Sequence, residues 1–293
     1  MHGWLVIDKP VGLGSTDVVS RVKRALRDAG YPKLKVGHGG TLDPLASGVL
    51  PVALGEATKL AGRMLDADKV YEFTIRFGEE TDTLDAEGEV VARSDVRPTP
   101  AQVEAVLARF TGEIEQVPPA YSALKVAGKR AYDLARSGTE VELNSRRVTV
   151  ASLALRRGAP NEITLEARVS KGTYIRSLAR DIAHALASVG HVIMLRRLKA
   201  GPFTLESAIS LDKMGELAKA RQLEQALLPL AAGLDDIPAL PVTPDQARLL
   251  RQGRALAGIA AKPGLHLATE SSVPVALVKL SEGCLRVVRG FNI

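Results

Sequence analysis

Cysteine is almost absent from this chain of 293 residues, which contains a single one, Cys284. One thiol excludes an internal disulfide and cannot build a cysteine-rich metal site. The five histidines are scattered along the chain and form no ligand motif. The sequence therefore predicts neither a disulfide-stapled fold nor a bound metal.

Long apolar runs are also missing. The longest are short ones such as residues 227–234, whereas a membrane-spanning helix needs ~18 apolar residues. The first residues, Met1 to Trp4, lack the charged, then apolar, then small-residue layout of a secretory signal. We expect a soluble cytoplasmic protein with no membrane partner.

Motifs for nucleotide cofactors and serine nucleophiles are lacking as well. Residues 12–15 lack the third glycine of a dinucleotide fingerprint, and residues 37–40 are not followed by the Lys-Ser/Thr pair of a phosphate-cradling loop. The chain contains no Gly-x-Ser-x-Gly nucleophile elbow. These absences predict chemistry without a nucleotide cofactor.

Positive charge is present in modest excess. Basic residues outnumber acidic ones by 39 to 33, which gives a formal net charge of +6. The excess gathers in residues 171–199, with six basic residues and one acidic, and in residues 238–293, with seven and three. Clustered cations are typical of proteins that bind phosphate backbones, although solvated helix faces and strand edges give the same pattern. A polyanionic partner is favoured but not required.

Strand and helix patterns are interspersed along the chain. Residues 70–77 alternate with period two, and residues 148–155 and 163–169 read as a hairpin. Helical spacing follows Ser15, begins again at Thr99-Pro100, and returns at about residues 174–187. Because strands and helices do not alternate regularly, we expect an α+β fold with a mixed or antiparallel central sheet and flanking helices.

The length allows one large domain or two, at ~150 residues per domain. Residues 235–241, Asp-Asp-Ile-Pro-Ala-Leu-Pro, read as a linker. Beyond them lie a short helix and the alternating runs 275–280 and 284–288. We expect a larger body at residues 1–236 and a small β-rich module at residues 237–293.

Asp43 is the first candidate for chemistry. It lies between the glycine-rich residues 37–40 and Pro44, with His38 five residues before it. A carboxylate fixed by a proline among small residues leaves room for a substrate to approach its oxygens. Aspartate before proline also caps turns, so spacing alone leaves both roles open.

Two of the five tyrosines stand among cations. Tyr121 precedes Lys125, and Tyr174 lies between Lys171 and Arg176. Such rings offer faces on which unstacked bases stack, and the cations beside them suit phosphates. Core packing at strand ends is the alternative interpretation of these tyrosines.

Residues 37–50, Gly-His-Gly-Gly-Thr-Leu-Asp-Pro-Leu-Ala-Ser-Gly-Val-Leu, resemble the catalytic motif of the TruB family of bacterial tRNA pseudouridine-55 synthases. Seven further blocks resemble the family in family order: residues 7–10, 55–59, 69–71, 81–85, 119–125, 171–176 and 195–198. Gly39 stands where the family usually has Thr and Gly14 where Ser or Thr is common, which we expect to loosen a loop. The tail after Pro238 resembles a short, divergent form of the family's PUA-like RNA-binding module.

The resemblance implies the pseudouridine synthase fold and the conversion of uridine 55 to pseudouridine in the T arm of tRNA, by a monomer without cofactor or metal. The base has to flip out of the folded arm before chemistry. Asp43 is the implied nucleophile, Arg176 its counter-ion and Tyr71 the ring that stacks on the base. Lys59, Tyr174, Leu195 and Asp85 are the further implied pocket residues, with Lys59 as a cation near the aspartate and Asp85 as a contact to the displaced nucleotide. His38 is implied to fill the vacated stack, and the other implied RNA contacts are Lys9, Lys125, Lys171, Arg196 and Arg197.

The sequence is compatible with two other functions. The chain could be a non-catalytic RNA-binding or tRNA-folding protein on the same scaffold, but such a protein need not keep a nucleophile with its counter-ion. Asp43 and Asp85 could instead be the carboxylate pair of a glycoside hydrolase. The basic clusters and the tyrosines among them disfavour a neutral sugar as substrate.

Overall fold

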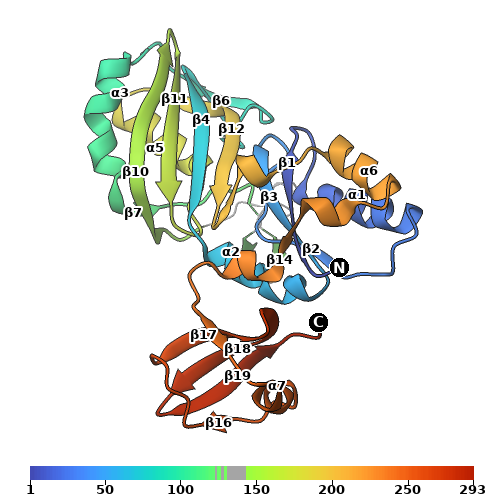
Figure 1. The fold of residues 1–293 in the computed structure, drawn as a ribbon. Coiled ribbons are helices and arrows are strands. Elements are labelled where there is room, and N and C mark those ends of the chain that lie inside the picture. The colour runs from blue at the N-terminus through green and yellow to red at the C-terminus, as the bar shows by residue number, and fades with distance from the viewer. Residues whose placement is uncertain (123, 127–128, 131–142) are drawn as a thin grey trace.

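A mixed sheet is the frame of the larger body in this computed structural model (Figure 1). The structure describes residues 1–122, 124–126, 129–130 and 143–293. In this part, the strands lie in the order β14 (Leu227–Pro229), β1 (Gly3–Lys9), β3 (Ser47–Leu54), β12 (Gly190–Ala200), β4 (Lys69–Phe77), β11 (Glu162–Val169), β10 (Arg146–Ala159) and β7 (Gly112–Gln116). β2 (Val36–His38) pairs with β3, and β13 (Phe203–Thr204) pairs with β12. The pairing of β12 with β3 is parallel, and the others are antiparallel.

Successive side chains of a strand point to opposite faces of the sheet, and in the central strands both sets of side chains are buried. In β1, Leu5 and Ile7 pack into one apolar cluster, whereas Trp4 and Val6 pack into a second. β3 divides its residues between the same two clusters. The body therefore needs cover on both faces of its sheet.

Helices cover the first cluster. They are α1 (Ser15–Asp28), α3 (Pro100–Leu107), α5 (Ile175–Ala185) and α6 (Leu211–Lys219). Val18, Val22 and Leu26 recur every four residues in α1, so they share the buried face of that helix. α3 begins at Pro100, where Thr99 caps it by accepting a hydrogen bond from the Gln102 backbone N–H. The shorter helices are α2 (Ala61–Asp66), η1 (Gly55–Leu60), η2 (Ala108–Phe110), η3 (Leu205–Ser207), η4 (Leu223–Ala226) and η5 (Leu230–Leu234).

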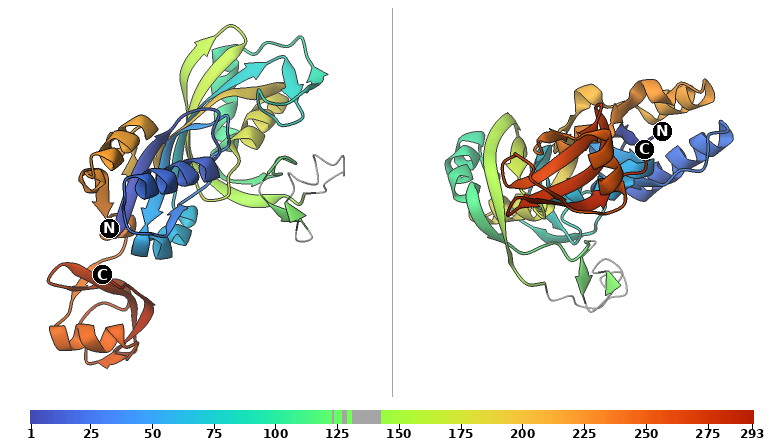
Figure 2. Two further views of the ribbon diagram at one scale, coloured as in Figure 1. Left: turned by 90° about the vertical axis from the view of Figure 1, so that its right-hand side faces the viewer. Right: turned by 60° about the horizontal axis from the view of Figure 1, so that its bottom comes forward.

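The C-terminal module is built on a second sheet. Its strands lie in the order β15 (Ala239–Pro241), β17 (Gly264–Glu270), β18 (Val273–Ser281), β19 (Cys284–Gly290) and β16 (Leu256–Ala257), and α7 (Pro244–Arg251) packs on them. The module lies at one end of the body, beyond α2 (Figures 1 and 2). Leu267, Leu277 and Phe291 pack into the same apolar cluster as Trp4 of β1. Body and module therefore share a buried contact.

Two small hairpins complete the described part. β5 (Glu79–Thr81) pairs with β6 (Val90–Arg93), and β8 (Lys125–Val126) pairs with β9 (Lys129–Arg130). The second hairpin follows the segment that contains Tyr121.

The predicted α+β fold with a mixed sheet and a β-rich C-terminal module is confirmed. The predicted hairpin is β10 with β11. The linker prediction for residues 235–241 is wrong in its second half, because residues 239–241 form β15 and pair in parallel with β17. Among the described helices, none is long and apolar enough to cross a membrane.

Candidate active site

A cavity of about 500 Å³ opens where β4 begins and β11 ends. Segments that are far apart in the sequence line it, chiefly the loop after β2, the start of β4, the turn into α5, and β12, with single residues from α2 and β10 and with residues 122 and 124. They place Asp43, Tyr71, Tyr174, Arg176 and Leu195 around one space. The structure therefore brings together five of the residues selected from the sequence.

Asp43 lies on the loop between β2 and β3 and leaves part of its carboxylate open to this cavity. Its Oδ2 is 2.8 Å from Nη2 of Arg176, and its side chain is 39% exposed. The backbone of the loop turns back at this point, because the Ala46 N–H donates to the Asp43 carbonyl at 3.0 Å. One side of the carboxylate is thus held by a cation while the other faces the cavity.

Arg176, near the start of α5, is the centre of the arrangement. Its side chain is only 7% exposed. Nη2 binds Asp43 and donates to the Tyr121 carbonyl at 3.0 Å, while Nη1 lies 3.1 Å from Asp85 Oδ2 and donates to the Thr83 carbonyl at 2.8 Å. A planar guanidinium with this many partners has one orientation, so it fixes the direction of Asp43.

Asp85 lies behind Arg176 and away from the cavity. Its side chain is 3% exposed, and its Oδ1 accepts hydrogen bonds from Thr83 Oγ1 at 2.6 Å and from the Glu87 N–H at 3.0 Å. The structure therefore does not place Asp85 as a contact to a displaced nucleotide, because both of its oxygens are occupied by protein groups. It positions Arg176. Burial, with the charges of Asp85 and Asp43 nearby, raises the pKa of Glu87.

Aromatic and apolar side chains line the rest of the cavity. Tyr71 of β4 pairs with Arg197 of β12. Leu195 lies two residues before Arg197 and therefore on the same face of that strand. The ring of Tyr174 is covered by Arg146, whose Cζ lies 4.6 Å from the ring centroid. The Tyr174 backbone N–H donates to Gln116 Oε1 at 2.8 Å, which fixes the entry into α5.

Lys9 holds the Asp43 loop from beneath. This buried amine donates to the carbonyls of Leu13 at 2.6 Å, Pro10 at 3.0 Å and Pro44 at 3.4 Å. Burial lowers the pKa of Lys9 to about 8, against the opposing effect of the Asp43 carboxylate. In the described structure its ammonium is enclosed by carbonyls rather than offered to RNA.

Arg197, predicted as an RNA contact, is a second buried cation beside this loop. The side chain is 1% exposed and donates through Nε to the Val49 carbonyl at 2.7 Å. Its Nη atoms donate to the Gly40 and Thr41 carbonyls, both at 3.2 Å. Gly48 lets β3 approach β12 closely, because a Cβ there would lie 2.2 Å from the Arg197 carbonyl oxygen. Arg197 therefore anchors the loop that carries Asp43.

Two cations at the cavity were not selected from the sequence. Lys69 lines the cavity, donates to the Leu65 carbonyl at 2.7 Å, and has its pKa lowered to about 8, mainly by burial and then by the charge of Arg197. Arg146 lies over Tyr174 and donates to the Gly172 carbonyl. Lys69 belongs to a block that resembles the family, and the Arg-Arg pair that opens β10 is the signal for Arg146.

His38 ends β2 immediately before the loop. It is half-buried, and within the described part of the chain its Nδ1 has no hydrogen-bond partner. Burial, followed by the charge of Arg197, lowers its pKa, which favours the neutral ring. The adjacent Gly39 is closely packed, since a Cβ there would lie 2.7 Å from Met64 Cβ.

Models of one protein family match most of the body. The N-terminal domain of TruB family pseudouridylate synthases matches residues 24–175, and the C-terminal domain of tRNA pseudouridylate synthase B matches residues 176–235. The tRNA pseudouridine synthase B of Novosphingobium aromaticivorans is 64% identical and aligns with 100% of this chain and 98% of its own length. That of Zymomonas mobilis is 63% identical, over 100% and 96%. The chain belongs to the TruB family.

Solved structures support the same assignment for this TruB protein. A chain of a Cbf5-Nop10-Gar1 complex is 29% identical, with a TM-score of 0.73 over 94% of this chain and 78% of that one. A chain of the archaeal box H/ACA sRNP Nop10-Cbf5 complex is 25% identical, with a TM-score of 0.73 over 99% and 86%. The second alignment includes the C-terminal module. The protein is a tRNA pseudouridine synthase of the TruB family.

The remaining predicted residues of the TruB protein lie outside the cavity. Lys59 is not near Asp43: its Nζ lies 2.6 Å from Glu56 Oε2 and donates to the Gly290 carbonyl of the C-terminal module at 2.8 Å. It therefore joins η1 to the module. Arg196 pairs with Asp8 at 2.8 Å, and Lys171 pairs with Asp66 at 2.9 Å on the surface. The side chain of Lys125, at the start of β8, lies outside the described residues.

Proposed function

We propose that this TruB protein converts uridine 55 in the T arm of tRNA to pseudouridine, with Asp43 as the nucleophile. The observation that carries the proposal is the Asp43–Arg176 pair, in which the carboxylate is held at 2.8 Å by a buried guanidinium and is still 39% exposed toward a cavity. An adjacent cation favours the ionised form of a carboxylate, and an ionised carboxylate is the nucleophile this chemistry needs.

The reaction is a rearrangement within one nucleotide. The N1–C1′ bond breaks, the uracil turns, and C5 bonds to C1′, while C5 loses its proton and N1 gains one. No electrons are exchanged with another molecule, so the nucleotide itself supplies every atom of the product apart from exchangeable protons. The protein has to hold the base, protect the detached uracil from escape, and present the carboxylate.

The cavity walls suit these tasks. Tyr71 offers a ring face for the base, and Leu195 closes the apolar side opposite polar backbone groups of the loop. The uncharged ring of His38, one residue before the Asp43 loop begins, is a planar group that would stack in place of the flipped base. The tRNA T stem-loop is the proposed partner of a monomeric enzyme in the cytoplasm.

The geometry favours this function over the two alternatives. A glycoside hydrolase needs two carboxylates that flank a scissile bond, but Asp85 is buried behind Arg176 with both oxygens occupied. A non-catalytic RNA-binding protein would gain nothing from the Lys9 and Arg197 anchors that hold the Asp43 loop in place. Such support is expected around a group that has to meet a reacting atom.

The test is pseudouridine mapping on tRNA incubated with the purified protein, together with tritium release from C5-labelled tRNA. We expect Asp43→Asn to abolish both signals while tRNA affinity stays within about tenfold, since one neutralised carboxylate adds no repulsion to the RNA. Asp95→Asn, at an exposed position after β6, is the matched control and keeps wild-type activity. Modification at a uridine other than 55, or a fully active Asp43→Asn variant, overturns the corresponding part of the proposal.

A further inference from the structure

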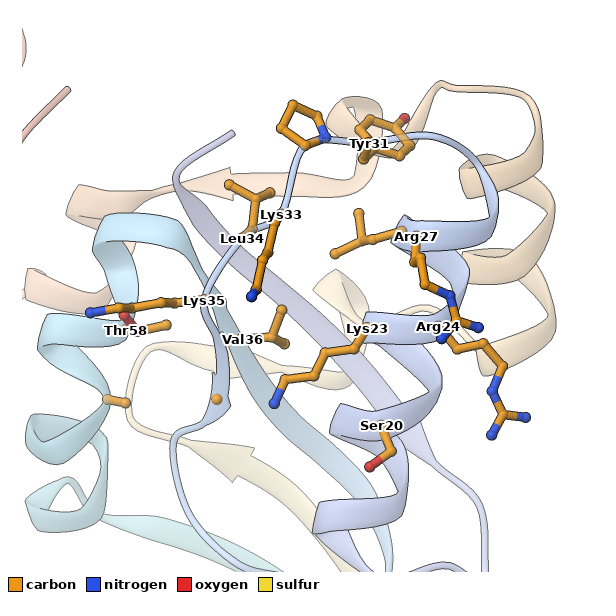
Figure 3. Close-up of a pocket in the computed structure, with 14 residues that line it drawn as sticks. Ser20, Lys23, Arg24, Arg27, Tyr31, Lys33, Leu34, Lys35, Val36 and Thr58 are labelled. Atoms are coloured by element: carbon orange, nitrogen blue, oxygen red, sulfur yellow. The ribbon is translucent and has the colours of Figure 1, made fainter.

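The largest groove in the described part of the molecule is not the Asp43 cavity. It has a volume of about 910 Å³ and lies between α1 and residues 31–37, with η1 at its far side (Figure 3). We refer to it as the α1 groove. Five cations line it: Lys23, Arg24, Arg27, Lys33 and Lys35.

These cations are exposed and little neutralised. Arg27 pairs with Asp28, and within the described residues the other four form no ion pair. Figure 3 shows Lys23 reaching from α1, and Lys33 from the facing segment, into the space between the two. Arg24 and Arg27 extend along the outer side of α1. The groove therefore presents positive charge from both of its walls.

The floor beneath the cations is apolar and fixed. Leu26 is buried, and Leu34 and Val36 are half-buried between the two walls. Tyr31 closes one end, where its hydroxyl is 3.3 Å from Glu224 Oε2 and Arg221 lies 5.5 Å over its ring. The cationic rim suits the phosphates of a nucleic-acid backbone.

A short segment of the chain, residues 37–40, links the α1 groove to the Asp43 cavity. Gly37 lines the groove and Gly40 lines the cavity, so their Cα atoms are at most ~11 Å apart at ~3.8 Å per residue. α1 starts at the same loop, because Ser15 Oγ accepts from the Leu42 N–H at 2.7 Å. The groove and the cavity are therefore neighbours at residues 37–42.

We propose that the α1 groove binds the sugar–phosphate backbone of the same tRNA whose uridine enters the Asp43 cavity, through Lys23 and Lys33. This site rests on tRNA as the substrate and adds a docking surface outside the base pocket. An acidic protein would match the rim charge as well, but the neighbouring loop that carries Asp43 favours RNA.

The experiment measures binding of a full-length tRNA transcript to the full chain at several salt concentrations. In the double variant Lys23→Gln/Lys33→Gln, we expect affinity to fall about tenfold at ~0.1 M salt, and the slope of log K against log salt to become shallower by about 1 to 2. With saturating tRNA, kcat stays at the wild-type value and KM rises. Lys23→Arg/Lys33→Arg keeps the charge and binds as the wild type.

The control is Arg109→Gln/Arg157→Gln, which removes the same charge from exposed positions on η2 and β10, away from both sites. If the groove variant binds tRNA like this control, the proposal is wrong, and an acidic partner becomes the occupant to seek. Pseudouridine mapping with the wild-type protein tests the position of modification independently of binding. If binding depends on the groove but another uridine is modified, the proposed position is wrong and the proposed groove contact stands.

Discussion

Residues 21–35 and residues 171–199 carry the same charge, six basic residues and one acidic residue each, and they use it in different ways. The second stretch turns five of its six cations toward protein groups. Arg176 binds Asp43 and Asp85, and Arg197 donates to two loop carbonyls and to the Val49 carbonyl of β3. Lys171, Arg180 and Arg196 pair with Asp66, Asp181 and Asp8. The first stretch lies on α1 and the segment after it, where Arg27 is the one cation in an ion pair among the described residues.

The difference follows from the position of each stretch in the fold. Residues 171–199 include α5 and β12, which meet the Asp43 loop and the hairpin near Asp85 at the centre of the body. Carboxylates and carbonyls from other segments surround them there. α1 presents its outer face to solvent at the side of the body (Figure 2). Charge counted along a sequence therefore locates cations, whereas their partners decide whether they build the site or contact the substrate.

Substitution of Arg176 is expected to have the largest effect, because its guanidinium binds protein groups at the centre of the site. We expect Arg176→Gln to lose about 3–5 kcal/mol of unfolding free energy, since Asp85 would be buried without its partner. Arg176→Lys keeps the charge but cannot hold both carboxylates and two carbonyls, so kcat falls at least about 100-fold. Thermal unfolding and tritium release measure the two effects. A fully active lysine variant would show that charge near Asp43 is sufficient and that orientation is not.

Arg197 tests whether a buried cation of this stretch contacts RNA. Arg197→Met leaves the carbonyls of Gly40, Thr41 and Val49 without their donor, at about 1–3 kcal/mol for a buried polar group left unpaired. We expect kcat to fall about tenfold as the loop loosens, with the salt slope of tRNA binding unchanged. A slope shallower by about 1 would place a phosphate on Arg197 and remove the contrast with the α1 groove.

Much of the fold could be predicted because local patterns carry it. The Thr99-Pro100 start of α3 and the hairpin of β10 and β11 need only capping chemistry and period-two alternation. The role of residues 239–241 could not be found in this way. Their strand exists because they pair with β17, where each partner lies 28 residues further along the chain. A short segment with two prolines looks like a linker until that partner is known.

The site was predictable as far as residue types and motifs identify chemistry. Asp43, Arg176, Tyr71, Tyr174 and Leu195 meet at one cavity as expected. Lys59 was misplaced because the sequence does not show that η1 faces the C-terminal module rather than the loop. The groove cations were overlooked because residues 21–35 contribute to no family motif, and amphipathic helices commonly carry charge on their solvent face.

The pH dependence of unfolding free energy distinguishes buried Lys69 from the exposed lysines of the α1 groove. Its folded pKa is about 8, below the ordinary 10.5, so the unfolded chain binds more protons between these values. Stability from Lys69 therefore rises as pH increases through this window, by at most about 1.4 kcal/mol per pH unit. Lys69→Met should remove that rise relative to the wild type in denaturant unfolding at pH 7 and pH 9.5. The pair Lys23→Gln/Lys33→Gln should leave the rise in place.

Lys171 is expected to show the smallest effect, because it belongs to residues 171–199 but forms its ion pair on the surface. Its Nζ is 2.9 Å from Asp66, and both side chains are about two-thirds exposed. Lys171→Gln should change unfolding free energy by less than about 0.5 kcal/mol, as is usual for exposed pairs. If Asp66 is what withholds Lys171 from RNA, Asp66→Asn should tighten tRNA binding about twofold and steepen its salt slope, and Asp66→Asn/Lys171→Gln should cancel both changes. Unchanged binding in Asp66→Asn would mean that the position of Lys171, and not its partner, keeps it from the substrate.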